Sequence, residues 1–432
     1  MGAAKKTLSL LRAYESRNVT FIESDGSWPI VWERARGAGV WDADGRQYID
    51  LTAAFGVAAA GHANPRVVRA GQRQMDKLLH AMGDVHPHPL KAQLARELSR
   101  LTFERWTART GPTGKTIFCN SGFEAVEAAL KTAMPATGRR GVIAFEGGYH
   151  GLGYGTLNAT HREHFRGPFR GQLGGFGQFA AFPQTPTSLK MLARDLKRRL
   201  RGKDIGAILV EPVQVRGGIR IPPVQFLPLL RRLCDEHGAL LILDEIYTGF
   251  GRTGKWFACE HSGVVPDLIC LGKALTGGFP LSACVGRAKL MDTAWPRSTG
   301  EAIHTSTFLG HPVGCAMALA QIAELRRLRL PERSAQLGRW LLRDLHEKIR
   351  NDDFEIAIAG LGLTVGVELC LPEKVPATIA TLGVIKEMLA QGFILLPEGP
   401  HANVISFTPP LTITRSQLSA AVNALKMVIR HR

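Results

Sequence analysis

The chain has 432 residues, more than the roughly 250–300 that one hydrophobic core usually supports, so we expect two domains. Its composition, 45% hydrophobic and 21% charged, is typical of a globular protein, and no run approaches the roughly 20 apolar residues of a membrane span. The formal net charge of +17 makes nucleic acid a candidate partner, whereas the seven scattered cysteines show no metal-like spacing.

The first residues do not read as a targeting signal. The apolar run Leu8–Leu11 is too short for the core of a secretory signal, and Lys6 stands where a myristoylation motif needs Ser or Thr. An odd number of cysteines suits a reducing compartment. We therefore expect a cytoplasmic protein without a metal or a membrane anchor.

Residues 30–50 predict a small antiparallel sheet, with strands at Ile30–Trp32, Gly39–Trp41 and Gln47–Asp50. From residue 62 to 310 helical and strand patterns alternate, which is typical of an α/β fold with a mostly parallel sheet and helices on both faces. Strands are expected at Thr116–Cys119, Gly141–Phe145, Ala207–Val210, Leu240–Asp244, Leu268–Leu271 and Ala283–Val285.

After residue 311 a long helix, Pro312–Arg329, leads into an α+β segment. We therefore expect a large α/β domain over residues 62–310. A smaller α+β domain would be formed by residues 1–61 and 311–432 together.

The first chemical motif is the segment from Asn120 to Glu127, which follows a strand and opens a helix. Ser121 is a good N-cap and Glu124 completes the pattern of a capping box. Free amides and the helix dipole at such an end attract phosphate, although many helices begin this way without binding anything. A glycine-rich turn, Glu146–Gly151, follows the next strand, and its Tyr149 could stack on a planar ring or simply pack.

Basic residues gather between Thr187 and Lys203. Leucines recur there at helical spacing, at positions 189, 192, 196 and 200, and most basic residues fall on the other face. A solvent-exposed helix face is the better interpretation than a surface for nucleic acid.

Two buried strands end in Asp244 and near Lys273. The carboxyl ends of such strands are where open α/β sheets bind ligands. A lysine held out of water can form a Schiff base with an aldehyde cofactor, and a carboxylate can keep a pyridine nitrogen protonated. A buried ion pair that ends both strands explains these two segments equally well.

Between them, residues Gly249–Gly254 match the G-x-G-x-x-G pattern. The residues that follow, Lys255–Ala258, are a poor start for a dinucleotide-binding helix, so we reject that interpretation.

Taken together, these segments resemble the class III aminotransferases that depend on pyridoxal phosphate (PLP), the ornithine and 4-aminobutyrate type of fold-type-I enzymes. The resemblance runs from Gly37–Asp42 through Gly61 and His62 to Pro409–Leu411, and it is most specific between Leu243 and Gly278. It implies a fold-type-I architecture, PLP as cofactor, and transfer of an amino group from an amine or amino acid to a carbonyl acceptor.

The resemblance also implies residue roles. Lys273 would form the internal aldimine and carry the proton, and Asp244 would hold the ring nitrogen. Other matching positions would surround the cofactor: Ser121, Gly122 and Phe123 at the phosphate, Tyr149 and Ile246 on the two ring faces, His150 and Tyr247 beside the ring, and Thr307 reaching in from a second subunit. A homodimer with a shared active site follows from the last of these.

Glu211 matches a carboxylate at the substrate entrance, but three positions depart from the family pattern. Tyr247 stands where the family often has a glutamine near the phenolic oxygen of the cofactor, Arg216 stands in place of a glutamate, and Ser406 replaces the arginine that clamps a carboxylate. Arg216 could supply the missing cation, or it could be a surface residue beside a glycine turn. Alternatively, Glu211 could favour an amino group on a diamine or amino sugar.

We therefore predict a homodimeric, PLP-dependent aminotransferase. Aminomutase, racemase or lyase chemistry on the same scaffold is the nearest alternative, because all share the bond between Lys273 and the cofactor. A basic nucleic-acid-binding protein on the same fold is the alternative from another class.

Overall fold

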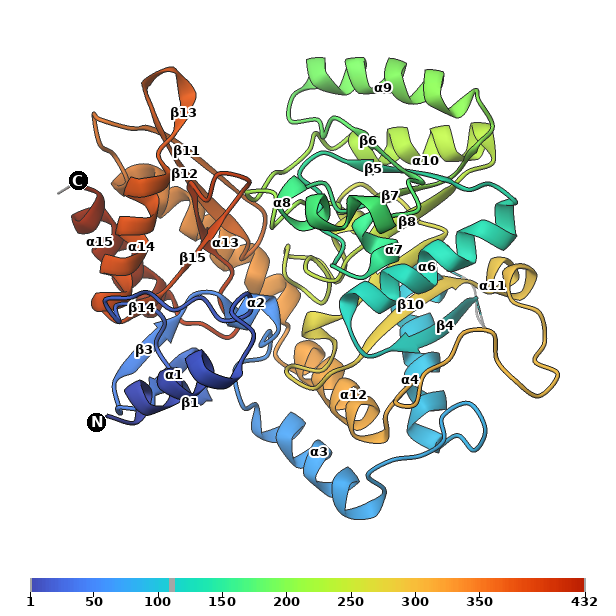
Figure 1. Cartoon of the computed structure of the whole chain (residues 1–432), viewed down its shortest axis with the longest axis horizontal. Coiled ribbons are helices and arrows are strands. Elements are labelled where there is room, and N and C mark those ends of the chain that lie inside the picture. The colour runs from blue at the N-terminus through green and yellow to red at the C-terminus, as the bar shows by residue number, and fades with distance from the viewer. Residues whose placement is uncertain (1, 109–112, 431–432) are drawn as a thin grey trace.

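The computed structural model describes residues 2–108 and 113–430. Residues 1, 109–112 and 431–432, which fall within the expected domain ranges, lie outside this description. The described chain divides into a larger part built on one wide sheet and a smaller part where the two chain ends lie together (Figure 1).

Within the described residues, a seven-stranded sheet has the order β4-β10-β9-β8-β7-β5-β6. Strand β10 runs antiparallel to β4 and β9, and the other neighbouring pairs are parallel. The strands are β4 (Gly114–Cys119), β5 (Gly141–Phe145), β6 (Gly177–Ala180), β7 (Ile205–Val210), β8 (Leu240–Asp244), β9 (Leu268–Leu271) and β10 (Ser282–Arg287). The predicted mostly parallel sheet is confirmed, although β6 was not predicted.

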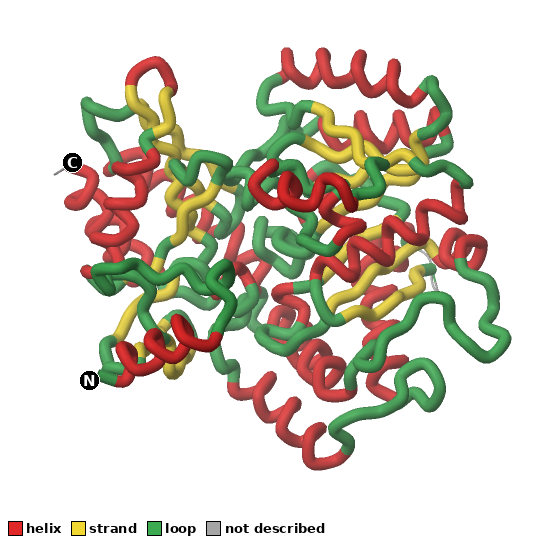
Figure 2. The backbone as a smooth tube through the Cα atoms, in the orientation of Figure 1, coloured by secondary structure: helices red, strands yellow, loops and turns green. Residues whose placement is uncertain are grey.

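Helices cover both faces of this sheet (Figure 2). Ile242 of β8 packs with the alanines of α6 (Gly122–Thr137), whereas Leu241 and Leu243 belong to the cluster that contains α10 (Phe226–His237). Side chains of successive strand residues point to opposite faces, so this continuous apolar strand is buried on both sides. The predicted helices on both faces are thus confirmed.

The remaining helices complete the layers around the sheet and the terminal part. They are α1 (Ala3–Tyr14), α2 (Ala53–Gly56), α3 (Pro65–Lys77), α4 (Pro89–Ser99), α5 (Arg105–Thr107), α7 (Tyr154–Leu157), α8 (Glu163–Arg166), α9 (Pro186–Leu200), α11 (Ala288–Ala294), α12 (Pro312–Arg327), α13 (Leu330–Lys348), α14 (Thr378–Ala390) and α15 (Arg415–Arg430).

The smaller part holds two further sheets. The first has the order β1-β2-β3-β14, and the second is antiparallel, with the order β11-β12-β16-β15 and β13 on β12. Their strands are β1 (Trp32–Arg36), β2 (Gly39–Asp42), β3 (Gln47–Asp50), β11 (Glu355–Gly360), β12 (Val365–Leu371), β13 (Val375–Pro376), β14 (Phe393–Ile394), β15 (Leu396–Glu398) and β16 (Val404–Phe407). In the first sheet, β14 from late in the chain pairs in parallel with β3 from its beginning.

Strands β2, β4, β7 and β10 are longer than predicted, and two predicted elements extend beyond the observed ones. The first strand was placed at Ile30–Trp32, but pairing with β2 begins only at Trp32, and Ile30 packs instead against the cluster around Val40. The long helix was expected to run to Arg329. It ends at Arg327, because Arg329 adopts a left-handed conformation (φ 49°) that separates α12 from α13.

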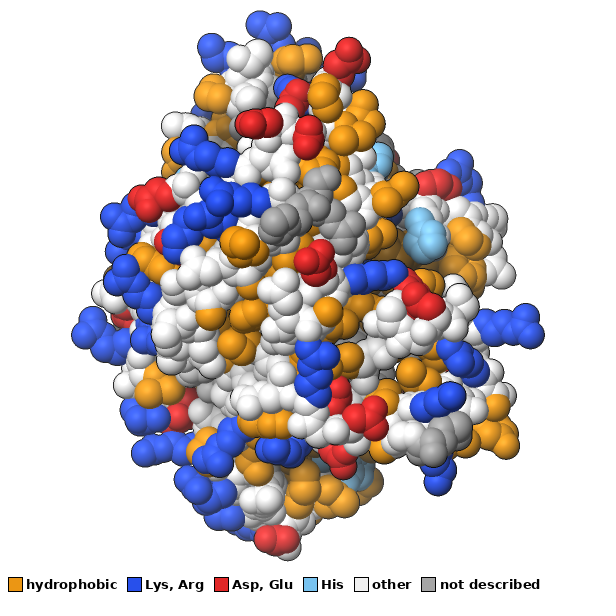
Figure 3. All heavy atoms as spheres, turned by 90° about the vertical axis from the view of Figure 1, so that its left-hand side faces the viewer, with side chains coloured by type: hydrophobic (Ala, Val, Ile, Leu, Met, Phe, Trp, Pro, Cys, Tyr) orange, Lys and Arg blue, Asp and Glu red, His pale blue; other side chains and the backbone are white. Residues whose placement is uncertain are grey.

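Helix α9 confirms the amphipathic helix predicted in the basic segment. Leu192, Leu196 and Leu200 are buried, whereas the Arg198 side chain is 79% exposed and paired with Asp195. Its basic face is therefore exposed to solvent. On the face formed by the terminal segments, Lys and Arg side chains lie scattered, with Asp and Glu among them (Figure 3).

No helix among the described residues combines the length and apolarity needed to cross a bilayer.

Candidate active site

A cavity of about 440 Å³ lies where the strands of the large sheet end. Asp244 ends β8, Lys273 follows β9, and Tyr149 and Glu211 follow β5 and β7. The cavity thus occupies the carboxyl edge of the parallel strands, where α/β sheets bind ligands. Its lining brings together ten of the predicted site residues: Gly122, Phe123, Tyr149, His150, Glu211, Arg216, Asp244, Ile246, Tyr247 and Lys273.

Lys273 is held in a strained backbone conformation directly after Gly272. Its φ of 28° is in the left-handed region, which costs energy for any residue with a side chain. Burial lowers the pKa of the Lys273 amine; the negative charge of Asp244 opposes this shift and the positive charge of Arg216 adds to it. A lowered pKa leaves more of the amine neutral and therefore nucleophilic.

Asp244 and His150 form a buried pair. His150 Nδ1 donates a hydrogen bond to Asp244 Oδ2 at 2.8 Å, and the two residues are 2% and 4% exposed. Burial disfavours the charged imidazole, but the hydrogen bond and charge of Asp244 outweigh it and raise the pKa of His150. The amide of Ile246 donates to the other oxygen, Asp244 Oδ1, at 3.1 Å. Both oxygens of Asp244 are therefore oriented by the protein.

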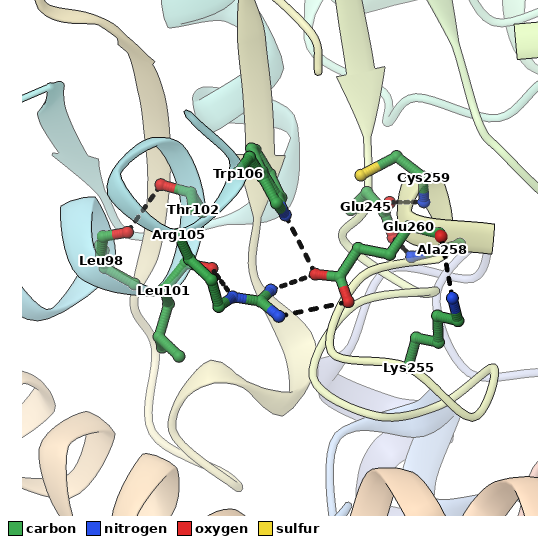
Figure 4. Close-up of polar contacts among 10 residues, drawn as sticks. All are labelled: Leu98, Leu101, Thr102, Arg105, Trp106, Glu245, Lys255, Ala258, Cys259 and Glu260. Carbon is green, nitrogen blue, oxygen red and sulfur yellow. Dashed lines mark hydrogen bonds and ion pairs between the residues drawn. The ribbon is translucent and has the colours of Figure 1, made fainter. Parts of the chain in front are cut away.

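The neighbouring residue, Glu245, fixes the end of β8 (Figure 4). It is fully buried, and its carboxylate accepts hydrogen bonds from the amides of Ala258 and Cys259 at 2.9 and 2.8 Å. Glu260, close by, binds Arg105 and accepts from Trp106 Nε1 at 3.1 Å. These contacts tie the segment after β8 to helix α5.

Glu211 is a buried acid beside the Asp244–His150 pair. Its Oε2 accepts a hydrogen bond from the Tyr149 amide at 3.2 Å. Burial, opposed by His150 and supported by the charge of Asp244, raises the pKa of Glu211 to about 8. Burial therefore favours the protonated, neutral form of this acid.

The start of α6 offers a place for a phosphate. Glu124 accepts from the amides of Asn120 and Ser121 at 2.6 and 3.2 Å. The predicted capping box is present, but the buried Ser121 hydroxyl makes no close hydrogen bond among the described residues. An unpaired hydroxyl at the end of a helix of 16 residues fits an anionic ligand.

The turn that carries Tyr149 packs tightly on this helix start. A Cβ atom on Gly151, whose φ is 108°, would lie 2.3 Å from the Cβ of Phe123. Ile246 packs against the start of α6, since a Cβ on Gly122 would lie 3.2 Å from its side chain. Tyr149 and Ile246 both line the cavity, as a group held between them would require.

Tyr247 lines the cavity beside Lys273. Its hydroxyl lies 3.2 Å from Thr408 Oγ1 and its ring lies 4.4 Å from Lys273 Nζ. The hydroxyl thus has a partner in the protein, and the ring forms a wall beside the lysine.

Arg216 lines the cavity from the substrate side. It forms an ion pair with the buried Glu398 at 3.2 Å, and its guanidinium carbon lies 5.6 Å from the centre of the Tyr149 ring. Ser406 does not line this cavity; it is buried in β16, paired with Gly366 and Leu396.

Thr307 is exposed and also lies outside the cavity lining. Its neighbour Ser306 accepts a hydrogen bond from the Asn120 side chain at 3.3 Å, which holds this loop beside the start of α6.

The sequence interpretation missed Glu398, Arg162 and Arg220. Glu398 meets Arg216 only because strand β15 folds back beside β16, a long-range contact that no local pattern indicates. Arg162 and Arg220 flank a second cavity that adjoins Arg216. Their positions in irregular segments gave no periodic signal.

Comparison with known proteins identifies the family to which this site belongs. Residues 21–429 match the family model "Aminotransferase class-III". The acetylornithine aminotransferase of Methanosarcina mazei is 35% identical, over 94% of this chain and 93% of that protein. The putrescine aminotransferase of Pectobacterium atrosepticum is 36% identical, over 99% and 89% of the two chains.

Solved structures that are similar to this chain are also transaminases. A PLP-bound amine transaminase from an uncultivated Pseudomonas species is 28% identical, covers 96% of this chain and 98% of its own, and superposes with a TM-score of 0.88. These relatives are named for amino transfer, so aminomutase, racemase and lyase chemistry are not favoured. The chain therefore belongs to the class III aminotransferases, enzymes of fold type I that depend on pyridoxal phosphate.

Proposed function

We propose that Lys273 is the residue that holds the cofactor and moves the proton during amino transfer between an amine or amino acid and a carbonyl acceptor. When bound, PLP supplies an aldehyde for the amine and a ring that accepts electrons. The observation that supports this role is the lowered pKa of Lys273 in the same cavity as the Asp244–His150 pair. A neutral Nζ can accept the proton from the substrate carbon and would pass it to the bound cofactor.

The surrounding residues would position the cofactor. Asp244, oriented by His150, would hold the proton on the ring nitrogen. The Ser121 hydroxyl and the first amides of α6 would bind the phosphate. Tyr149 and Ile246 would support the two faces of the ring.

Replacement of Lys273 by alanine tests the central assignment. We expect kcat to fall by about 10²–10⁴-fold, since the variant lacks a positioned proton carrier. Borohydride reduction of the holoenzyme, followed by peptide mass mapping, should place the cofactor label on Lys273. The exposed Lys190→Ala variant is the matched control. A label on another lysine, or full activity of Lys273→Ala, would refute the assignment.

The sequence suggested two hypotheses for the substrate: Arg216 binds a carboxylate, or Glu211 binds an amino group. We now favour the first. Glu211 is buried and its pKa is raised to about 8, so it is a poor anion for a diamine. Arg216 is only 26% exposed and faces the cavity. We therefore favour a donor with a carboxylate that Arg216 binds, as in the relative named for acetylornithine, over a diamine, as in the relative named for putrescine.

We also infer a homodimer whose second copy covers the face beside Thr307. The support is a group of exposed apolar side chains on two segments joined by the Thr305–Asp84 hydrogen bond of 2.6 Å. These side chains are Leu79, Met82, Val85, Ile303 and Phe308, exposed by 60%, 53%, 62%, 75% and 55%. Apolar patches of this kind mark protein interfaces.

The double substitution Leu79→Glu and Phe308→Glu should convert dimers to monomers in sedimentation equilibrium and lower activity with them, because the active site would lose its partner. Ile379→Glu, at an 88% exposed position on α14, is the control. A native enzyme that sediments as a monomer would contradict this inference.

A cytoplasmic location is the corresponding proposal for the cell. It rests on the cysteines, all seven of which are free thiols.

A further inference from the structure

A buried threonine, Thr160, holds the turn Gly148–Gly151, which carries Tyr149 and His150. Thr160 follows α7 and is fully buried, behind the cavity lining that the described residues form. Its hydroxyl accepts a hydrogen bond from the His150 amide at 3.0 Å and donates one to the Gly151 carbonyl at 2.9 Å. A hydroxyl can do both at once, because it has one donor and two lone pairs. One side chain thus bridges two neighbouring peptide groups of the turn.

His150 is therefore fixed at two points. Thr160 holds its backbone amide, and Asp244 accepts the hydrogen bond from its ring at 2.8 Å. Close packing limits any other position of the turn: a Cβ on Gly148 would lie 3.3 Å from His150 Nε2, and a Cβ on Gly151 would collide with the first turn of α6. Because the His150 amide is buried, the loss of its acceptor would favour a shift of the turn. The position of the ring thus depends on Thr160.

The segment that bears Thr160 does not need the hydroxyl in order to fold. The Thr160 amide donates to the Thr156 carbonyl at 2.8 Å, and the His161 amide donates to the Gly148 carbonyl at 2.9 Å. These bonds join backbone groups, so they persist with any side chain at position 160. Removal of the hydroxyl alone should therefore affect the two bonds to His150 and Gly151 and leave the segment in place.

We propose that Thr160 is a positioning residue for amino transfer. It keeps His150 aligned with Asp244, and through this pair it keeps the Asp244 carboxylate where the ring nitrogen of the cofactor binds. The inference rests on the proposed function, in which Asp244 holds the proton on that nitrogen. It gives a side chain behind the cavity control over how firmly the cofactor is bound and how well it is used.

Thr160→Val tests the proposal, because valine has nearly the shape of threonine but lacks the hydroxyl. Titration of the apo-enzyme with PLP, followed by absorbance, should give a Kd about tenfold above the native value. In the holoenzyme kcat should fall about tenfold, whereas KM for the amino donor should change by less than about twofold, since donor binding is not affected. Thr160→Ser keeps the hydroxyl and should recover most of both losses.

Thr132→Val is the matched control. Thr132 is also fully buried, and its hydroxyl donates to the Ala128 carbonyl at 2.7 Å and accepts from Trp295 Nε1 at 3.0 Å. The two valine variants therefore lose the same kinds of hydrogen bond, but those of Thr132 do not involve the turn. Thr132→Val should keep the native Kd for PLP and the native kcat, even where its urea midpoint falls.

A double-mutant cycle shows whether Thr160 acts through His150. His150→Phe keeps an aromatic ring but cannot donate to Asp244. When Thr160→Val is added to His150→Phe, kcat should change by less than about twofold further.

Three results would each overturn the positioning role while the proposed function stands: native Kd and kcat in Thr160→Val, an equal loss in Thr132→Val, or losses that multiply in the double variant. A native protein that binds no PLP would overturn both.

Discussion

Arg216 is a positive charge held between a buried carboxylate and the active-site cavity. We expect Arg216→Gln to raise KM for a donor that carries a carboxylate about tenfold, with a smaller change in kcat, because a charge-assisted hydrogen bond of about 1.5 kcal/mol is lost. Steady-state kinetics with acid and amine donors measures this.

The same substitution leaves Glu398 buried without its partner. The double variant Arg216→Gln, Glu398→Gln removes that charge and is the appropriate control. An unchanged KM in both variants would show that Arg216 is only a structural residue beside a glycine turn.

At the scale of single residues, the sequence located the groups that sit at strand ends. Asp244 and Lys273 could be placed because two apolar runs stop at them, and parallel strands bring their carboxyl ends to one edge. The contacts of Arg216 with Glu398 and of His150 with Asp244 could not be predicted. Both join residues that are far apart in sequence, and no local pattern records such a pairing.

Among the elements, the end of strand β8 depends on the buried Glu245. Burial raises its pKa from 4.5 to about 7, although the hydrogen bonds from Thr248, Ala258 and Cys259 oppose this. An acid whose pKa is raised by folding contributes its full stability below the unfolded pKa of 4.5 and loses it as pH rises through about 7.

Between pH 4.5 and about 7, ionisation of Glu245 should lower the free energy of unfolding of the native protein by up to about 3 kcal/mol. Glu245→Gln should remove this loss, because glutamine does not ionise. Urea unfolding of the holoenzyme at a series of pH values, taken as the difference between variant and native protein, measures the effect. Glu236→Gln, on the exposed side of α10, should follow the native profile. A profile of Glu245→Gln parallel to the native one would contradict the prediction.

Strands with strongly apolar sequences were predicted well, and weak or interrupted elements were not. β5, β8 and β9 begin and end at the predicted residues. β6 was missed because it is a short strand at the edge of the sheet, with one buried residue. The break after α12 was also missed, because the left-handed conformation falls on Arg329, and an arginine gives no warning of it.

Across the whole molecule, Arg252 joins the larger and the smaller part. It is 1% exposed, and its Nη1 donates to the carbonyl groups of Leu363 and Pro409 at 3.1 and 2.5 Å. Arg252→Leu should lower the free energy of unfolding by about 2 kcal/mol, because both buried carbonyls lose their donor. Urea denaturation measures this, with the exposed Arg198→Leu as control. An unchanged or raised midpoint would mean that the buried charge costs as much as its hydrogen bonds contribute.

We propose that the two parts are domains that divide near residues 62 and 310. Two observations support this division: strand β14 completes the sheet begun by β3, and the second antiparallel sheet is formed by residues after 350. The apolar core nevertheless continues from the large sheet into this part, since Leu243 and Ile405 belong to one cluster. The domains therefore share a core and should unfold together.

The close packing at Gly151 limits how such an enzyme can change during evolution. Any larger side chain there would collide with Phe123, so the turn bearing Tyr149 and the first turn of α6 are free to move only as one unit. Mutations that separate these two turns would weaken phosphate binding at α6 and, at the same time, the packing of Tyr149 on the cofactor ring. New specificities are therefore expected to arise at the opposite wall, by exchange of arginines, while the cofactor's seat stays as it is.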